Sequence, residues 1–187
     1  MKKGGFTLIE ICVAVAIFSL AITALFGFLN QTTKTQERSL IMGRMIDNTS
    51  YVLEYMSRAL RMAKKDDLGG VNCLVGNKVN YEITRAGQGI KFRNYKDECQ
   101  EFFLESDKLK EWKNTGGIQA ENFFTPSNIE IGDFKIGPSD TWDQNDDQQP
   151  RVTLYLKAVY SEGYWSNSPL LLDVQTTVSQ RNLDVRR

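Results

Sequence analysis

The stretch that decides the fold lies near the N-terminus, where residues 5–29 read GFTLIEICVAVAIFSLAITALFGFL. The apolar run from Phe6 to Leu29 contains a single charge, Glu10. It predicts about 36 Å of helix at roughly 1.5 Å per residue, enough to cross a hydrocarbon core of about 30 Å. Two lysines precede the run, so the positive-inside rule predicts a cytoplasmic N-terminus and an exported remainder.

Three interpretations of this run are open. A cleavable secretory signal would have a shorter apolar stretch followed by small residues of the Ala-x-Ala type. Here the run is long and leads into residues 30–34, Asn-Gln-Thr-Thr-Lys, which offer no such site. An uncleaved signal anchor fits the length. The third interpretation depends on the residues at the junction, residues 5–10.

Residues 5–10, Gly-Phe-Thr-Leu-Ile-Glu, resemble the prepilin processing motif of type IV pilins and pseudopilins. The resemblance implies that prepilin peptidase removes residues 1–5 as a leader by cutting after Gly5, and methylates the new N-terminal residue, Phe6. It also implies that Glu10 is the family's signature carboxylate and acts in filament assembly. The implied partners are the peptidase, other pilin or pseudopilin subunits, an inner-membrane assembly platform and membrane lipid.

Glu10 has two physical interpretations. A carboxylate at the centre of a membrane span costs about 2.5–3.5 kcal/mol on insertion scales and is normally paired or functional. The freed amine of Phe6 on an incoming subunit and Glu10 of its neighbour would neutralise each other and set a register. Alternatively, Glu10 lies one turn from the helix start, where it would reach the headgroups and be favoured by the helix dipole.

Beyond the membrane run the sequence predicts that the same helix continues. Residues 30–39 are polar on every side, so we expect a soft segment there, with Gly27 as the candidate weak point. Apolar residues then recur at three- and four-residue steps, which is typical of one helical stripe, suited to core packing or to an adaptable Met-rich groove. The stripe comprises Met42, Met45, Ile46, Thr49, Val52, Leu53, Met56, Ala59, Leu60 and Ala63.

Two basic residues followed by a pair of glycines predict where this helix ends. The helical continuation is expected to span residues 30–68, with Lys64 and Lys65 in its last turn. The pair Gly69-Gly70 would end it. On the exposed face, Glu54 and Arg58 have the spacing of an i, i+4 ion pair.

Residues 69–187 predict a β-rich globular domain. Apolar residues alternate with polar ones in segments separated by turns such as Gly87-Gln88-Gly89 and Ser106-Asp107. The segments are 79–83, 90–92, 102–104, 109–112, 129–136, 152–160 and 170–178. Strands with one apolar face suit an antiparallel sheet packed on the helix stripe. The predicted fold class is therefore α+β, with the first half of a long N-terminal helix (residues 6–29) in the membrane.

The resemblance extends more loosely into this half. The order of long helix and then sheet is the pilin architecture, and residues 149–152 and 174–179 look like the closing strands of minor pilins and of the J-type pseudopilin of type II secretion. These residues do not distinguish between a pilus, a type II secretion filament and a DNA-uptake filament.

The three cysteines divide by environment. Cys73 and Cys99 are both exported under the predicted topology, so oxidation is available to them, and they flank an expected strand pair. We predict a disulfide between them; the alternative is two unrelated small core residues. Cys12 lies in the apolar run and is most simply a small apolar residue.

A loop dense in oxygen ligands, Asp140–Asp147, begins like a calcium-binding loop at Asp143, Asn145 and Asp147. Gln148 stands where glycine should follow, and Leu154 stands where a bidentate Glu is required. Some pseudopilins bind calcium through a C-terminal loop. We interpret this run as a solvated loop and predict no metal.

Composition argues against most catalytic classes. Lys plus Arg and Asp plus Glu number 23 each, so no basic excess indicates nucleic acid. The chain has no histidine, which removes the commonest general base and metal ligand. It also lacks a Gly-x-Ser-x-Gly or Walker motif, and no cofactor is expected. The sequence predicts a structural filament subunit; the alternative is a stationary, signal-anchored extracytoplasmic binding module.

Overall fold

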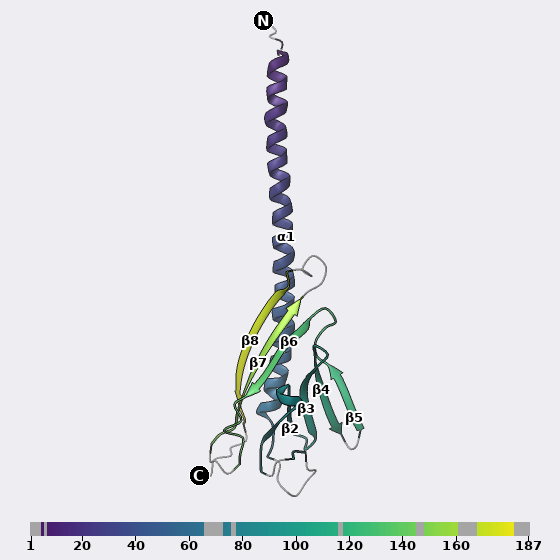
Figure 1. The fold of residues 1–187 in the computed structure, drawn as a ribbon, viewed down its shortest axis with the longest axis vertical. Helices are drawn as coiled ribbons and strands as arrows, with labels where there is room; N and C mark the ends of the chain where they lie inside the picture. Colours follow the sequence, from purple (N-terminus) through teal and green to yellow (C-terminus); the bar gives the residue numbers. More distant parts are fainter. Residues whose placement is uncertain are drawn as a thin grey trace. The chain divides into compact units, whose positions relative to one another are not determined.

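The computed structural model describes residues 5, 7–65, 73–75, 78–115, 118–144, 148–160 and 168–181. The chain forms two compact units, Met1–Gly43 and Arg44–Arg187. Helix α1 (Leu8–Arg61) contributes to both (Figure 1). The other elements are β1 (Tyr81–Thr84), the 3₁₀ turn η1 (Arg85–Gly87), β2 (Gly89–Arg93), β3 (Cys99–Glu105), β4 (Lys108–Thr115), β5 (Ile118–Phe123), β6 (Glu130–Gly137), β7 (Arg151–Tyr160) and β8 (Leu170–Ser179). The α+β class is confirmed.

The first unit contains the apolar part of α1 and the polar residues that follow it to Gly43. In the apolar part, Ser19 and Thr23 are compatible with an apolar surrounding because each hydroxyl donates back to a carbonyl one turn earlier. Ser19 donates to Val15 O and Thr23 to Ser19 O, both at 2.8 Å. The helix is continuous through residues 30–39 and through Gly27. There Thr32 donates to Phe28 O at 2.9 Å in the same way.

In the second unit, most of the predicted apolar stripe of α1 is buried, but Ile46, which the prediction included, is 46 % exposed. The buried residues of the helix are Met45, Thr49, Val52, Leu53, Met56 and Leu60. Met45 and Met56 have no exposed surface, so these two methionines serve as core. On the exposed face, Glu54 and Arg58 form the expected ion pair at 2.7 Å. The pair is solvent-exposed and therefore contributes little to stability.

The strands form two antiparallel sheets, whereas the sequence predicted one. The first has the order β1-β2-β3-β4-β5, and the second has the order β6-β7-β8 (Figure 1). The physical reason lies at the tight β3–β4 turn. Ile131 N, in β6, donates to Asp107 O in that turn at 2.8 Å. Lys108 Nζ donates to the carbonyls of Pro126, Ser127 and Ile129, so β6 starts beside a turn and begins a new sheet.

Most predicted strands are present, and one was missed. β7 buries Val152, Leu154, Leu156 and Ala158 on one face, as expected. The turn at residues 87–89 also forms, with a positive φ at Gly87. β5 was not predicted, because its apolar alternation is limited to Ile118 and Ala120, and all six residues are exposed. It pairs with β4 along residues 110–115, and Lys110 Nζ lies 5.0 Å from the centre of the Phe123 ring.

The C-terminus of α1 differs from the prediction. The helix ends at Arg61, before Lys64 and Lys65, and residues 69–70 lie outside the described residues. Its last carbonyls are capped by groups from the sheets rather than by glycine. The Tyr81 hydroxyl donates to Leu60 O at 2.8 Å, and Arg181 N donates to Arg61 O at 2.7 Å.

A third donor bonds a carbonyl just beyond the helix end. Gln180 Nε2 donates to Ala63 O at 2.8 Å, while the Gln180 backbone N–H donates to Pro150 O at 2.9 Å. Burial raises the pKa of Tyr81, so its phenol remains a neutral donor. Both sheets therefore fix the end of the helix.

Replacing Tyr81 with Phe should lower the free energy of unfolding by about 1 kcal/mol, because one buried hydrogen bond is lost while Leu60 O keeps its bond from Ala63 N. Urea unfolding of the full chain in detergent, followed by tryptophan fluorescence, measures the change. Tyr51→Phe is the matched control, since Tyr51 lies on the exposed face of the same helix. An equal effect of the two substitutions would contradict the capping role.

Candidate functional site

The processing motif lies at the start of α1. Gly5 is exposed, and Phe6, the expected methylated residue, lies outside the described residues. Thr7 precedes the first helical residue, Leu8, and occupies the N-cap position. Gly5 and Thr7 are both exposed, so the described residues on either side of Phe6 are compatible with cutting after Gly5.

Glu10 and Thr7 form a reciprocal cap. Glu10 Oε2 accepts the backbone N–H of Thr7 at 2.8 Å and the Thr7 hydroxyl at 2.9 Å. The backbone N–H of Glu10 reaches Thr7 Oγ1 at 3.4 Å. This is a capping box, in which the first and fourth residues satisfy each other's unpaired N–H groups. The hydrogen bonds of Glu10 to described residues all use one of its two carboxylate oxygens.

The cap adds a role for Glu10 that neither sequence interpretation included. The signal was present in the sequence, because Thr-x-x-Glu immediately before an apolar run is the pattern of a capping box. The cap orders the helix start, and Glu10 Oε1 makes no hydrogen bond to a described residue. Capping and pairing with a second chain therefore do not exclude each other.

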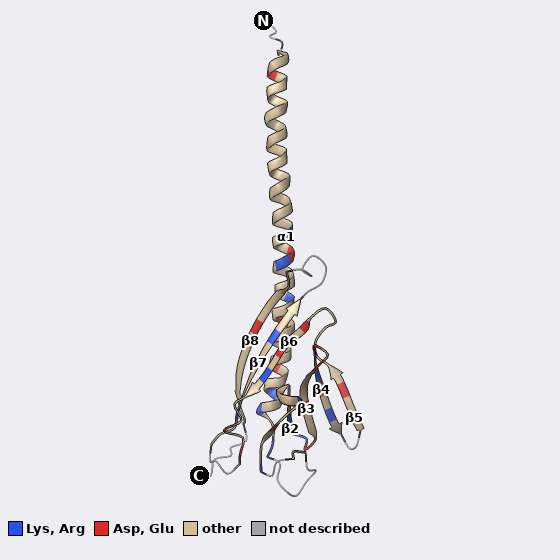
Figure 2. Ribbon diagram, in the orientation of Figure 1, with Lys and Arg blue, Asp and Glu red and all other residues tan. Residues whose placement is uncertain are grey.

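Helix α1 is the one described helix that is long and apolar enough to span a membrane, by length and composition. Figure 2 shows one acidic position near its start, followed by several uncharged turns. Apart from Ile22, the large apolar side chains along residues 8–29 are more than half exposed, from Leu8 at 81 % to Val13 at 53 %. This surface fits a membrane-anchored protein, because it would be costly in water.

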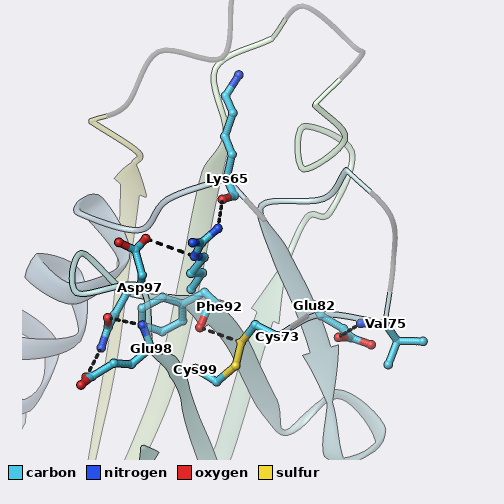
Figure 3. The surroundings of a disulfide bond; sticks show 10 residues. Lys65, Cys73, Val75, Glu82, Phe92, Asp97, Glu98 and Cys99 are labelled. Carbon is cyan, nitrogen blue, oxygen red and sulfur yellow. Dashed lines mark hydrogen bonds and ion pairs between the residues drawn. A yellow bond between two sulfur atoms is a disulfide. The ribbon is translucent and has the colours of Figure 1, made fainter. Parts of the chain in front are cut away.

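Cys73 and Cys99 lie together and form a disulfide, with Cα atoms 5.3 Å apart (Figure 3). Both are buried in a small cluster that also contains Leu74, and Trp112 packs against it. The bond joins the segment that follows α1 to the first residue of β3. Cys12, in contrast, is exposed on the membrane-length part of the helix.

The first half of the acidic loop is part of the fold, so our interpretation of a solvated loop was wrong there. Thr141 and Trp142 are buried, and Trp142 Nε1 donates to Arg151 O at 2.8 Å. Asp143 is exposed and forms a β-bridge with Val79. Residues 145–147 lie outside the described residues, and the described ones contain no cluster of potential metal ligands.

Comparison with known proteins gives one finding. Residues 1–26 match the family model described as the prokaryotic N-terminal methylation motif. The match covers the capping box and most of the apolar run, and ends before the polar part of α1. Among curated proteins and among solved structures, no match was found.

Removing the Cys73–Cys99 bond should lower the free energy of unfolding by roughly 3 kcal/mol on the chain-entropy model, for a sequence separation of 26. The double substitution Cys73→Ala, Cys99→Ala should show this loss in urea unfolding. Cys12→Ala is the control, because Cys12 lies on an exposed helix surface. Non-reducing peptide mapping should recover the two cysteines in one linked peptide. Two alkylatable thiols in oxidised protein would contradict the bond.

Proposed function

We infer that this chain, which its N-terminal methylation motif marks as a type IV pilin-like precursor, is a structural subunit of an envelope-spanning filament: a minor pilin or pseudopilin. The observation that carries the proposal is the combination at residues 5–10. A processing motif leads directly into a capped helix whose apolar, membrane-length part carries one acidic side chain, Glu10, in the first turn. A stationary anchor needs the helix but has no use for a freed, methylated amine.

Each segment of the chain has its own role in such a subunit. Residues 1–5 are removed as a leader, and residues 6–29 hold the precursor in the inner membrane with its N-terminus cytoplasmic. Residues 30–61 carry the helix out of the membrane to the globular unit. Prepilin peptidase, other pilin or pseudopilin subunits and an inner-membrane assembly platform are the partners.

Assembly would replace lipid by neighbouring helices around the exposed apolar surface of residues 8–29. In this environment the charge of Glu10 is costly unless it is paired. The amine of Phe6 on a second subunit supplies an opposite charge and hydrogen-bond donors, and the unused oxygen of Glu10 accepts them. The pairing sets the axial offset between the helix of one subunit and the helix of the next.

The rival function is a stationary, signal-anchored module whose globular unit captures a ligand. It shares the anchor and the fold with the filament subunit. Processing decides between them, because only the filament subunit requires a new N-terminus. The motif suggests a structural protein rather than an enzyme.

We predict that the mature protein begins at Phe6 and carries one added methyl group. The intact mass of protein extracted from membranes with an active prepilin peptidase should show the loss of residues 1–5. Gly5→Leu should block the cut, because a side chain is placed where the peptidase requires glycine. A wild-type chain that still begins at Met1 in such membranes would favour the stationary anchor.

Glu10→Leu separates anchoring from assembly. Without the charge the span is more apolar, so membrane insertion should be equal or better. Incorporation into filaments should nevertheless fall, because the amine of an incoming subunit loses its partner. Glu10→Gln should show a milder defect, since the amide keeps an acceptor for the Thr7 N–H.

Thr7→Ala is the matched control for the cap, because it removes the hydroxyl and leaves the carboxylate. Co-purification of each variant with sheared filaments gives the readout. A defect of Thr7→Ala as large as that of Glu10→Leu would assign Glu10 to helix capping alone. Equal recovery of Glu10→Leu and wild type would leave the pairing without support.

A further inference from the structure

The connection between β5 and β6, residues 124–129, is bound by a lysine side chain. Lys108, the first residue of β4, directly follows the two-residue turn Ser106–Asp107. The Lys108 ammonium donates to three backbone carbonyls of the connection: Pro126 O at 3.1 Å, Ser127 O at 2.9 Å and Ile129 O at 2.6 Å. An ammonium group has three protons and no acceptor. These three carbonyls therefore use its whole hydrogen-bonding capacity.

Backbone hydrogen bonds bring these carbonyls to one point. The Ile129 N–H donates to Pro126 O at 3.2 Å, which closes a tight turn over residues 126–129. The Ile131 N–H, two residues further on, donates to Asp107 O at 2.8 Å, in the turn that precedes Lys108. The carbonyl oxygens of residues 126, 127 and 129, which we call the carbonyl cage, are therefore positioned by the backbone.

The carbonyl cage meets the charge of Lys108 without a carboxylate. Glu105 is opposite Lys108 in the β3–β4 ladder, but its own ion pairs are with Lys110 and, at 3.4 Å, with Arg85. Within the described part of the chain, Lys108 has no ion-pair partner. Its positive charge is therefore balanced by the dipoles of three neutral carbonyls.

The oxygens of the carbonyl cage are of the kind that bind monovalent cations. Converging backbone carbonyls replace the hydration shell of K⁺ in its protein sites. Sites for Ca²⁺ and Mg²⁺ usually include carboxylates, and the cage has none. An ammonium is a compact point charge, whereas the planar guanidinium of arginine directs its donors in a fixed fork. An ammonium can therefore take the place of a monovalent ion in this cage.

The carbonyl cage also positions apolar residues of the connection on α1. Pro126 and Ile129 line one small cavity together with Thr49 and Val52 of the helix. The side chain of Ile129 is buried. Because the Ile129 carbonyl also accepts the ammonium, the contact that fills the cage holds this residue against the helix.

We propose that residues 126–129 form a monovalent-cation site that this chain fills with its own Lys108 ammonium. The tethered cation keeps the connection closed on α1 and on the β3–β4 turn, so that β6 starts its own sheet beside the first one. Without the ammonium, the carbonyl cage binds K⁺ or a small alkylammonium ion of the same charge. The inference concerns the globular unit and does not rest on the filament function.

The test compares Lys108→Met with Lys135→Met in urea unfolding of the full chain in nonionic detergent. Methionine keeps an unbranched chain and removes the charge. Lys135 is the matched control, because it is an exposed lysine on β6 that pairs with Asp133 at 2.7 Å, outside the carbonyl cage. Lys108→Met should lower the folding equilibrium constant at least about tenfold more than Lys135→Met, because hydrogen bonds to a charged group are lost.

Chloride salts of different cations, at equal ionic strength, then identify the site. Replacing tetramethylammonium by K⁺ or methylammonium should raise the folding constant of Lys108→Met, about twofold when the cation concentration equals its dissociation constant. Wild type and Lys135→Met should show no such preference, since their cage is occupied. Equal stability of the two variants, or the same response of both to the salts, would overturn the proposal.

NMR of the wild type tests the occupied cage even where Lys108→Met does not fold. The Lys108 ammonium protons all have acceptors, so they should exchange with water slowly enough to give a nitrogen-correlated signal. Lys108→Arg should lack this signal, and Lys135→Met should keep it. A wild-type spectrum without it would contradict the proposal.

Discussion

The structure depends on an apolar helix surface that the described part of the chain does not cover. Residues 8–29 expose Leu, Ile, Val and Phe side chains around the whole helix, while the backbone and the hydroxyl groups satisfy their hydrogen bonds internally. Such a segment is stable in lipid or among similar helices and unstable in water. Either environment makes the single carboxylate at its start the costliest group in the segment.

The globular unit holds the C-terminal end of the long helix α1. The stripe from Met45 to Leu60 supplies the buried apolar contact. Tyr81 and Arg181 satisfy the last helix carbonyls, and Gln180 bonds Ala63 O just beyond the helix, so these groups come from opposite ends of the β-rich region. The disulfide joins the segment that follows α1 to the first residue of β3.

The spacing of apolar residues along the sequence was sufficient to predict the features that depend on a single helix or strand. The membrane-length run, the buried stripe on α1 and the alternation in β7 each follow from the spacing of side chains along one element. Two features were readable in the sequence and were missed or misjudged. The Thr7–Glu10 pattern is a capping box, and the Trp in the acidic loop is a large apolar residue that a folded chain buries.

Other features depend on contacts between distant segments. At the helix end, Arg61 O accepts the backbone N–H of Arg181, and Ala63 O, just beyond the helix, accepts Gln180 Nε2. Contacts over more than a hundred residues leave no pattern near residue 61 from which to predict this end. The division into two sheets depends on Lys108 and the β3–β4 turn meeting residues 126–131. β5 has no buried face and is held at the sheet edge by its pairing with β4. Alternation of apolar and polar residues identifies strands with a buried face, but it does not identify an exposed edge strand such as β5.

The central claim, that Glu10 receives the amine of another subunit, is tested most directly by zero-length carbodiimide crosslinking of filaments grown from a mixture of ¹⁴N- and ¹⁵N-labelled cells. The reagent joins an amine to a carboxylate that contacts it, and mass spectrometry of the linked peptides reveals which chains were joined. The account predicts a crosslink between the Phe6 amine of one subunit and Glu10 of another, recovered as mixed-isotope pairs or as a link to a different pilin. Crosslinks of Glu10 found solely within single-isotope chains, in filaments that contain the protein, would contradict it.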